Sequence, residues 1–575
     1  MNAKRIPLTG ILVTSLLLLG GAYFFWQAPD EAGPSSATAV QRGGQIVASV
    51  RGEPRSFNRF VVSDLTSVMV SELTQGRLVR INRNTFELEP WLAEKWEAGP
   101  DGRTYTLHLR PGVTWSDGTP FTSADVLFSV RAVFDPKVES VLAGSLMVAG
   151  QPIRAAAPDP QTVVFTYAGP SGPGVGLLNN LTILPKHKLE AALNAGTLGS
   201  AWDSKTPLAE IVGTGAFVLR EYQPGQRLVL DRNPRYWRKA ADGQALPYLD
   251  RLVLEIVPEQ NAELLRLQSG STDLTYTELR SEDYVAARRG EEEGRLTVIE
   301  LGVAPDAEAF WFCLKPEAKK ADKRFAFVQK PEFRRALSYA VDREAFAETV
   351  YLGAAVPVWG PITPGNKVWF WPDIPRYPHS VDRAKELLRE IGLEDRDGNG
   401  VVEDASGTEA RFTVITQRGR YERGTSVLRD AVKEVGVVLD LAPLEFGAML
   451  KRLLACDYDA IYMLPLVTDL DPAGNLDFWL SSGSAHFWNL EQKTPATEWE
   501  RRIDTLMLEQ ASSTDPERRK MQFEAVQKIL AENLPVLHFA APRMYYAHSA
   551  RLRGVVPSVQ RPPVLWNADS LSVSQ

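Results

Sequence analysis

The chain reads Arg103-Thr-Tyr-Thr-Leu-His-Leu-Arg-Pro-Gly-Val-Thr-Trp-Ser-Asp-Gly-Thr-Pro-Phe-Thr-Ser-Ala-Asp-Val126 at the point that decides its fold. Apolar and polar residues alternate from Tyr105 to Arg110, which is typical of a half-buried strand. Turns are expected at residues 111–112 and 115–120, where Gly and Pro recur. Thr122 and Asp125 have the spacing of a capping box, so a helix is expected to begin there. The stretch therefore predicts a strand, turn, helix unit.

The same mixture of strands and helices continues on both sides of this unit. Residues 46–50 and 252–257 predict strands, the second of which ends at Pro258. An amphipathic pattern predicts a helix at about 261–268, with Gly270 as its C-cap. Further helices are expected at 331–351, 380–391, 423–436, 447–455 and 497–533. Because strands and helices are interspersed and no internal repeat is found, we expect an α/β fold.

The composition is that of a globular chain long enough for several domains. Of 575 residues, 44% are hydrophobic and 23% are charged, which excludes a disordered, collagenous or many-span membrane protein. The 64 Lys and Arg against 71 Asp and Glu give a net charge of −7, so no nucleic-acid partner is expected. The two cysteines, Cys313 and Cys456, exclude a disulfide-dense scaffold and a Cys-rich metal site.

The N-terminus carries an export or anchor signal. Lys4 and Arg5 precede an uncharged, mostly apolar stretch that ends in an aromatic cluster at Trp26. Residues 1–26 are therefore expected to be a signal peptide or an N-terminal membrane anchor, and residues 27–44 a flexible tether. No cysteine follows the apolar stretch, so lipidation is not expected. Because the positive end stays inside, the rest of the chain is expected to lie outside the cytoplasm.

Four blocks of sequence resemble the family 5 extracellular solute-binding proteins, the dipeptide and oligopeptide receptors of ATP-driven importers. The first block is 92–126, which contains the stretch from Arg103 to Val126. The others are 213–219 with 224–226 and 230–237, 333–343, and 514–519 with 529–536. Since these blocks lie between about 45 and 560, the resemblance covers nearly the whole exported part.

The resemblance implies an α/β, two-lobed periplasmic-binding-protein-like fold (type II, cluster C). Lobe I would comprise residues 45–308, with an extra subdomain at about 85–205 and a return of the chain at 540–575. Lobe II would comprise residues 309–539. Strands that cross between the lobes would lie near 310–314 and 461–464. Cys313 and Cys456 adjoin these strands, and in an oxidising compartment either one disulfide or two buried thiols would fit.

The implied function is that of an extracytoplasmic receptor. It would capture a peptide between its lobes as a monomer and deliver it to the permease subunits of an ABC transporter, with no cofactor and no chemistry. A non-peptide cargo (an oligosaccharide, haem or a nickel complex) and a peptide-sensing role are the alternatives. An enzyme is not expected, since G-x-S-x-G, H-E-x-x-H and phosphate-loop motifs are absent and the six histidines are scattered.

In the family, an aspartate that is followed shortly by an acidic residue and a proline holds the peptide's amino terminus. Alignment on Pro472 places Thr468 at that position. A hydroxyl cannot neutralise a buried ammonium, so this departure weakens the inference to an ordinary peptide cargo. The neighbouring Asp469 would replace the anchor if the loop shifts, with Asp471 as a second carboxylate. The alternative is that Asp469 only shapes a loop.

Five further positions are candidate ligand contacts. Trp479 and Trp488 belong to a dense aromatic group with Phe478 and Phe487, which would suit a pocket wall or, alternatively, the core. By the resemblance, Asn58 and Phe60 begin the first loop near the ligand, and Trp359 lies in a segment that often faces the cleft.

Residues 395–406 match part of a calcium-binding loop. Asp395, Asp397 and Asn399 occupy positions 1, 3 and 5, Val401 would offer its carbonyl at position 7, and Glu403 stands at position 9. The twelfth position holds Ser406 in place of the bidentate Glu. Because runs of Asp, Gly and Asn also form turns, a calcium site and a plain turn are both consistent with this pattern.

Overall fold

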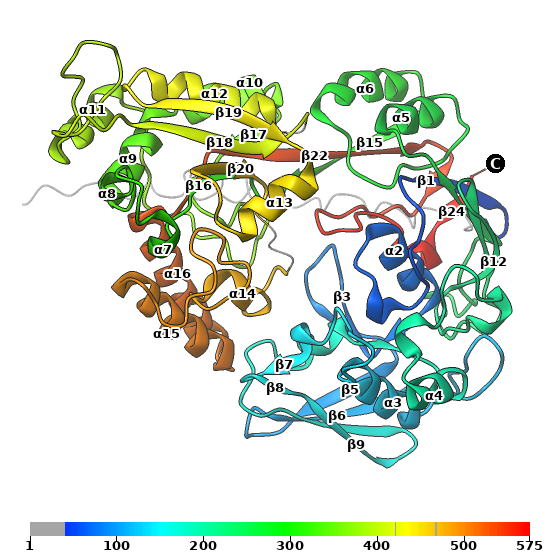
Figure 1. The fold of residues 1–575 in the computed structure, drawn as a ribbon. Coiled ribbons are helices and arrows are strands. Elements are labelled where there is room, and N and C mark those ends of the chain that lie inside the picture. Colours follow the sequence, from blue (N-terminus) through cyan, green and yellow to red (C-terminus); the bar gives the residue numbers. More distant parts are fainter. Residues whose placement is uncertain (1–40, 420, 466–468, 575) are drawn as a thin grey trace, which may run out of the picture. The chain divides into compact units, whose positions relative to one another are not determined.

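The computed structural model describes residues 41–419, 421–465 and 469–574 (Figure 1). The chain divides into two units, Met1–Gln41 and Arg42–Gln575, and every described helix and strand belongs to the second. The expected signal or anchor and most of the expected tether lie outside the described residues. Within the described part, no helix is both long and apolar enough to span a membrane.

The first hydrophobic core is built on a four-stranded sheet. Its strands follow the order β1 (Gln45–Val50), β14 (Arg251–Ile256), β13 (Arg227–Arg232) and β12 (Phe217–Gln223), and β1 pairs in parallel with β14. Both strands predicted from alternation are therefore confirmed. Helix α5 (Gln260–Gln268) follows β14 as predicted, although Ser269 is its C-cap and Gly270 comes next. Helix α2 (Leu65–Thr74) also packs into this core.

The stretch from Arg103 to Val126 forms part of a second sheet joined to the same core. Strands β5 (Ala93–Ala98), β6 (Thr104–Leu109), β10 (Thr162–Thr166) and β9 (Arg154–Asp159) form this sheet in that order. Helix α3 (Ser123–Val133) begins at Thr122, and both hydrogen bonds of the capping box with Asp125 are present. The predicted strand, turn, helix unit is thus confirmed. Helix α4 (Lys186–Ala195) packs against α3.

The second core surrounds a five-stranded sheet. Its order is β19 (Val438–Leu444), β18 (Arg411–Gln417), β20 (Ala460–Met463), β16 (Ala309–Phe312) and β21 (Val536–His538). Buried residues of this core run from Ala309 to Ala540, whereas those of the first run from Ile46 to Tyr276 and return from Tyr546 to Val573. The predicted α/β fold with two lobes is confirmed, and the C-terminal segment rejoins the first core.

Two predicted helices are each divided in two. Residues 331–351 form α9 (Pro331–Ala340) and α10 (Arg343–Tyr351), because Asp342 caps the second helix by accepting from two backbone N–H groups. Residues 497–533 form α15 (Glu498–Ser512) and α16 (Pro516–Asn533), because Asp515 caps α16 and Pro516 occupies its first turn. The predictions at 380–391, 423–436 and 447–455 correspond to α11 (Val381–Glu390), α12 (Glu422–Lys433) and α13 (Phe446–Leu454).

The two cores are joined by one long strand, β22 (Ala540–Ser549). It pairs with β15 (Leu296–Val303) along one part and with β17 (Ala355–Pro357) along the other, as Figure 1 shows. The chain passes from the first core to the second between β15 and β16. The prediction that residues 310–314 and 461–464 cross between the lobes is therefore wrong, since both segments lie inside the second sheet, where β16 and β20 pair.

The remaining elements are short or peripheral. They are β2 (Gly76–Arg77), β3 (Val79–Ile81), β4 (Leu88–Pro90), β7 (Met147–Val148), β8 (Gln151–Pro152), β11 (Thr182–Ile183), α6 (Tyr284–Glu292), α7 (Pro316–Lys319), α8 (Phe325–Val328), α14 (Leu476–Trp479), β23 (Leu552–Arg553) and β24 (Ser572–Val573).

Cys313 and Cys456 form a disulfide, which resolves the alternative that the sequence left open. Their Cα atoms lie 5.9 Å apart, and 143 positions separate them in the chain. Cys313 directly follows β16, and Cys456 follows the end of α13. The bond therefore ties a helix that flanks the second sheet to one of the sheet's central strands.

Replacing both cysteines by alanine is expected to lower the free energy of unfolding by about 2–4 kcal/mol, because a long loop is no longer closed in the unfolded chain. Urea denaturation of the C313A/C456A variant against the oxidised wild type measures the difference. A reducing agent should lower the wild-type midpoint and leave that of the variant unchanged. An unchanged midpoint in the double variant would contradict the bond.

Candidate functional site

A cavity of about 2860 Å³ is lined by residues of both cores. The first core contributes mainly residues 51–91, 141–182, 276–282 and 559–569, and the second mainly 350–369, 464–465, 469–480 and 508–520. Pockets for single small molecules typically measure about 300–1,000 Å³, so this cavity has room for a ligand of several residues or for a large cofactor-sized molecule.

The described lining is rich in charge of both signs. It contains eleven arginines and two lysines together with twelve aspartates and glutamates. Eight aromatic residues are present as well: Phe86, Trp91, Tyr236, Tyr276, Tyr351, Trp369, Phe478 and Trp566. A cavity with this composition suits a polar ligand that carries both positive and negative groups.

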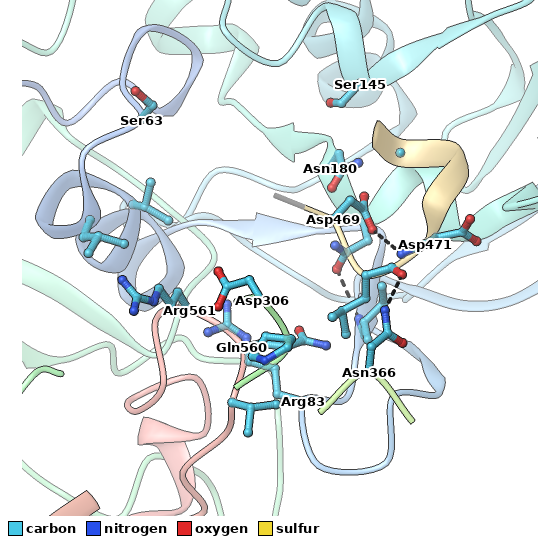
Figure 2. A pocket seen from close by; sticks show the side chains of 18 of the residues that line it. Ser63, Arg83, Ser145, Asn180, Asp306, Asn366, Asp469, Asp471, Gln560 and Arg561 are labelled. Atoms are coloured by element: carbon cyan, nitrogen blue, oxygen red, sulfur yellow. Dashed lines mark hydrogen bonds between the residues drawn. The ribbon is translucent and has the colours of Figure 1, made fainter. Parts of the chain in front are cut away.

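Asp469 and Asp471 both line the cavity, but the structure gives them different surroundings (Figure 2). Asp471 caps the short helix Pro472–Asn475 by accepting from Ala473 N at 2.9 Å. Its carboxylate also accepts from Arg519 Nη2 at 2.6 Å, and only 9% of the Arg519 side chain is exposed. The Asp471 charge is thus already neutralised by a buried cation, which gives this residue a structural role.

Asp469 has no cation at ion-pair distance among the residues that the structure describes. Its Oδ1 accepts from Asp471 N at 2.9 Å, and its own N–H donates to Asn475 Oδ1 at 3.0 Å. A Cβ atom on Gly474 would lie only 2.4 Å from Asp469 Oδ2, so the backbone of the following turn packs directly against the carboxylate. Burial and the neighbouring Asp471 charge together raise the pKa of Asp469 to about 6.

Two asparagines support this loop from other segments. Asn366 donates from Nδ2 to Leu470 O at 2.9 Å and is itself buried. Asn180 ends the short helix Gly174–Asn180 of the first core and lies beside Asp469 in Figure 2. Its side-chain amide favours the ionised carboxylate, which partly opposes the rise in the Asp469 pKa. Asp469 is therefore held in place by neutral groups, and its charge is left available to a ligand.

A cluster of arginines faces the cavity from the first core. Arg77 and Arg83 both pair with Glu72 on α2, at 3.0 and 2.6 Å. Arg59 donates to Val62 O at 2.6 Å, and burial together with the Arg77 charge lowers the pKa of Arg59 to about 10. Three arginines thus face Glu72 and the more distant Asp64, which leaves an excess of positive charge. Tyr276 lines the same region with a buried hydroxyl that has no hydrogen-bond partner among the described residues.

The other sequence-predicted contacts do not line this cavity in the part of the chain that is described. Asn58 is fully buried, accepts from Phe60 N at 3.1 Å and donates to Leu198 O at 2.8 Å. Phe60 lies in the first core. Trp479 and Trp488 are 2% and 1% exposed and pack edge-on against Phe478, which does line the cavity.

Trp359 and Thr468 complete the set of predicted contacts. Trp359 lines a separate small pocket with Phe478 and His538, and the guanidinium groups of Arg343 and Arg376 lie 5.3 and 5.0 Å from its ring centre. Thr468 lies outside the described residues. Of the seven predicted contacts that the structure describes, Asp469 and Asp471 are the two that line the main cavity.

The sequence patterns did not reveal the arginine cluster, Tyr276 or the two supporting asparagines. These residues come from segments that are far apart in the chain, and a single arginine or asparagine resembles a surface residue. One signal was available: Arg77, Arg80 and Arg83 recur at every third position directly after α2. Three arginines within seven residues concentrate positive charge, and this concentration could have indicated a binding surface.

Removing the Asp469 charge is expected to stabilise the ligand-free protein. The pKa of Asp469 is about 6 in the folded protein, above its value of about 3.8 in the unfolded chain. Below about pH 4 the carboxyl is neutral in both states, and its full contribution to the free energy of unfolding is present. As the pH rises through about 6 the folded protein must bury a charge, and this contribution is lost. The melting temperature of D469N should therefore exceed that of the wild type above pH 6, and the difference should shrink toward pH 4.

Differential scanning calorimetry from pH 4 to 8 tests this expectation. The matched control is D477N, because Asp477 follows in α14 eight residues later, lines the same cavity and is exposed. Its melting temperature should follow that of the wild type at every pH. A D469N variant that is less stable than the wild type at pH 7.5 would show that the carboxylate supports the fold.

The sequence of this chain is similar to those of known solute-binding proteins. The model of the bacterial extracellular solute-binding proteins, family 5 Middle, matches residues 87–487. A probable ABC transporter-binding protein of Deinococcus radiodurans is 26% identical over 90% of both chains. The oligopeptide-binding protein AppA of Bacillus subtilis is 25% identical over 92% of both chains.

One solved structure and two further relatives are also similar to this chain. The crystal structure of the ABC transporter substrate-binding protein CtaP of Listeria monocytogenes is 24% identical, with a TM-score of 0.76 over 93% of this chain and all of that one. A periplasmic alpha-galactoside-binding protein of Rhizobium meliloti is 25% identical over 80% of this chain and 69% of its own length. Heme-binding protein A of Haemophilus influenzae is 25% identical over 94% of this chain and 96% of its own length.

Proposed function

Because this chain belongs to the family 5 bacterial extracellular solute-binding proteins, we propose that it is a peptide receptor of an ABC importer. Members of the family bind solutes outside the cytoplasm and work with ABC transporter permeases. The proposal concerns the cargo, which is a di- or oligopeptide held between the two lobes. No catalytic step and no cofactor are part of it.

The charge of the cavity lining carries this proposal. Many of the thirteen cationic and twelve acidic side chains of the lining pair within the protein, as Arg83 does with Glu72 and Arg519 with Asp471, but Asp469 has no such partner among the described residues. An oligosaccharide has no charge, so it could not neutralise Asp469 on binding. A peptide is a zwitterion with further polar groups along its backbone. Its two ends need opposite charges in the receptor, and the cavity offers both Asp469 and an excess of arginine.

In the proposed complex, the peptide's ammonium group binds the Asp469 carboxylate. This carboxylate is partly buried, is fixed by backbone N–H groups and has no cation of its own in the described part. Binding an ammonium there replaces lost hydration by a charge-assisted hydrogen bond. The peptide's carboxylate is then drawn to the cluster of Arg59, Arg77 and Arg83 in the first lobe, where a bidentate pair can form.

A second candidate cargo is favoured by the aromatic residues of the lining. Trp91, Trp369 and Trp566 bring to the lining ring systems of the kind that stack on sugar rings or on haem. Such stacking would displace guanidinium groups, since Arg80 lies over the rings of Trp91 and Trp566 and Arg519 over that of Trp369. Two of the relatives are named for such ligands. The charges nevertheless make a peptide the better match for the cavity as a whole.

We further propose that residues 1–26 direct export or anchor the chain and that residues 27–44 form the tether. The body would then work on the outer side of the cytoplasmic membrane as a monomer and dock onto the permease subunits there. The apolar stretch, the preceding Lys4 and Arg5 and the family's extracellular location support this arrangement.

Peptide binding is expected to weaken about tenfold between pH 7.5 and pH 5.0. With a pKa of about 6, roughly a tenth of the Asp469 carboxyl groups are ionised at pH 5.0, whereas nearly all are ionised at pH 7.5. A peptide's α-amino group, with a pKa of about 8, is fully charged at pH 5.0 and mostly charged at pH 7.5, so its titration changes this ratio little. Isothermal titration with a peptide selected by thermal shift from di- to pentapeptides measures the ratio of the two dissociation constants.

Three comparisons decide between the cargoes. D469N should bind the peptide weakly and with no dependence on pH, whereas D477N should behave as the wild type. An N-acetylated version of the same peptide should fail to bind the wild type. A thermal shift only with raffinose-type oligosaccharides, haem or nickel–histidine, or equal binding of the free and acetylated peptides, would reject the peptide-amine mechanism.

A further inference from the structure

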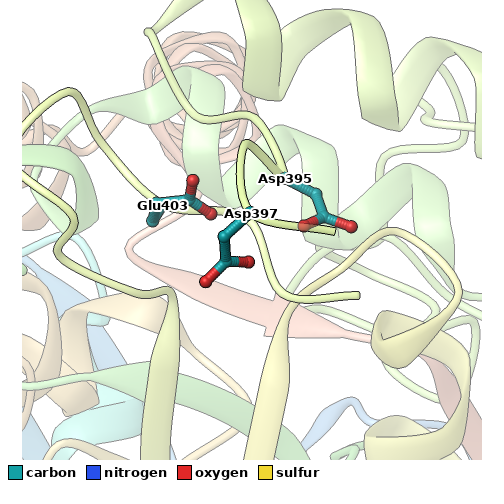
Figure 3. A group of neighbouring side chains, drawn as sticks. All are labelled: Asp395, Asp397 and Glu403. Carbon is teal, nitrogen blue, oxygen red and sulfur yellow. The ribbon is translucent and has the colours of Figure 1, made fainter. Parts of the chain in front are cut away.

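The loop between α11 and β18 gathers three carboxylates at a place remote from the cavity. Asp395, Asp397 and Glu403 each offer one oxygen, and these three oxygens all lie within 4.8 Å of one another (Figure 3). None of the three residues lines the main cavity. We propose that this loop is a binding site for a calcium ion, which would stabilise the second lobe.

The burial of Glu403 is the observation that points to a cation. This residue is only 6% exposed. One of its oxygens, Oε1, accepts from Arg396 N at 2.8 Å, but Oε2 is buried and accepts no hydrogen bond from any described residue. A buried carboxylate oxygen without a partner is costly, and a bound cation would remove that cost.

Nearby cations do not supply the missing charge. The Arg396 guanidinium donates to the backbone carbonyls of Glu403 and Gly392, and it approaches Glu394 at 3.7 Å. Arg411 pairs with Glu409 at 3.4 Å. Among the described residues, none forms an ion pair with Asp395, Asp397 or Glu403. Three negative charges therefore converge on one point with no positive charge between them.

Turn formation explains only part of this arrangement. Asp395 accepts from Gly398 N at 2.9 Å and from Gly400 N at 3.0 Å, and Asp397 accepts from Asn399 N at 3.0 Å. These hydrogen bonds explain why aspartates stand at these two positions of the turn. They do not account for Glu403, which lies outside the turn and yet directs its carboxylate toward it in Figure 3.

The position of Glu403 also accounts for the departure from the calcium-loop pattern. In that pattern a glutamate at position 12 supplies two oxygens from the helix that follows the loop, and here Ser406 stands at that position. Glu403 forms isolated β-bridges with Glu394 on one side and Glu409 on the other. A short ladder thus holds a glutamate three residues earlier, where it can replace the missing ligand.

We assign Asn399 and the Val401 carbonyl as the remaining protein ligands, by their spacing in the loop. The Asn399 amide already lies between two carboxylates, because Nδ2 donates to Asp397 Oδ2 at 3.1 Å and to Glu409 Oε1 at 3.0 Å. Its Oδ1 accepts from Val401 N at 2.7 Å, so a half-turn that presents this oxygen to an ion exchanges that hydrogen bond for a metal–oxygen bond. All ligands in this assignment are oxygen atoms.

Calcium fits this set better than magnesium. Oxygens at about 2.3–2.6 Å from Ca²⁺ lie up to about 5 Å apart, which matches the observed spread, whereas Mg²⁺ requires about 2.0–2.1 Å and strict octahedral geometry. Extracellular calcium modules bind with dissociation constants of about 0.1–1 mM. The loop is anchored on the second core by Leu393 and Ala410, which are 1% and 0% exposed, so binding would stabilise that lobe.

The test is calcium titration of the full-length protein after removal of metal with EDTA. Isothermal titration should give one site with a dissociation constant of about 0.1–1 mM, and 10 mM CaCl₂ should raise the melting temperature by roughly 1–3 °C. MgCl₂ at the same concentration should raise it clearly less. No heat of binding, or equal shifts with both ions, would overturn the assignment.

Variants separate binding from turn formation. D397N should weaken calcium binding at least tenfold, and E403Q should abolish the melting shift. In EDTA, E403Q should be at least as stable as the wild type, because it no longer buries an unpaired charge. D101N is the matched control, since Asp101 caps a similar exposed turn by accepting from Arg103 N and Thr104 N. If D101N and E403Q leave calcium binding equally intact, the loop is only a turn.

Discussion

The pairing of β22 with two other strands is the constraint on which the rest of the structure depends. Its ten residues hydrogen-bond to β15 along one part and to β17 along the other. Because the backbone of one continuous strand serves both cores, the lobes are connected but not fused, and the space between them remains open as a cavity. A receptor that releases its cargo needs such a connection, since its open and closed states must differ by only a few kcal/mol.

In the cavity lining, some charged side chains form ion pairs within the protein, whereas charged neighbours of theirs do not. Asp471 and Asp469 are two residues apart, yet Arg519 neutralises only the first. The paired carboxylate fixes the loop, and under the proposed function the unpaired one remains costly until the peptide's ammonium group binds it. Burial raises the pKa of Asp469 for the same reason, since it disfavours the charged form. Binding sites are commonly less stable than they could be for this reason, because the charge that recognises the ligand destabilises the empty site.

Local signals in the sequence predicted local structure well. The alternation in β6, β1 and β14 and the capping box of α3 depend on neighbouring residues, and each was found where it was expected. The breaks before α10 and α16 were missed, although an aspartate cap stands at each, because the apolar pattern continues across both. The family resemblance, and no local signal, identified the two-lobed fold.

The cavity could not be predicted in the same way, because its walls come from segments hundreds of residues apart. Asn180 and Asp469 are neighbours only after folding, and so are the arginines near α2 and the C-terminal residues 559–569. Trp479 and Trp488 show a second difficulty: the dense aromatic group suited a pocket wall or the core, and packing against Phe478 places both in the core. Composition alone does not distinguish a wall from a core.

The two unpaired carboxylate sites differ in the kind of cation that they can accept. Asp469 is partly exposed, stands alone and faces a large cavity, so an organic ammonium can reach it and keep contacts with water and backbone. Glu403 is almost fully buried and converges with two aspartates, which suits a small ion that loses its water and takes several oxygens at once. Access and the number of converging oxygens, more than the charge itself, therefore separate the site proposed for a transported solute from the site proposed to stabilise the receptor.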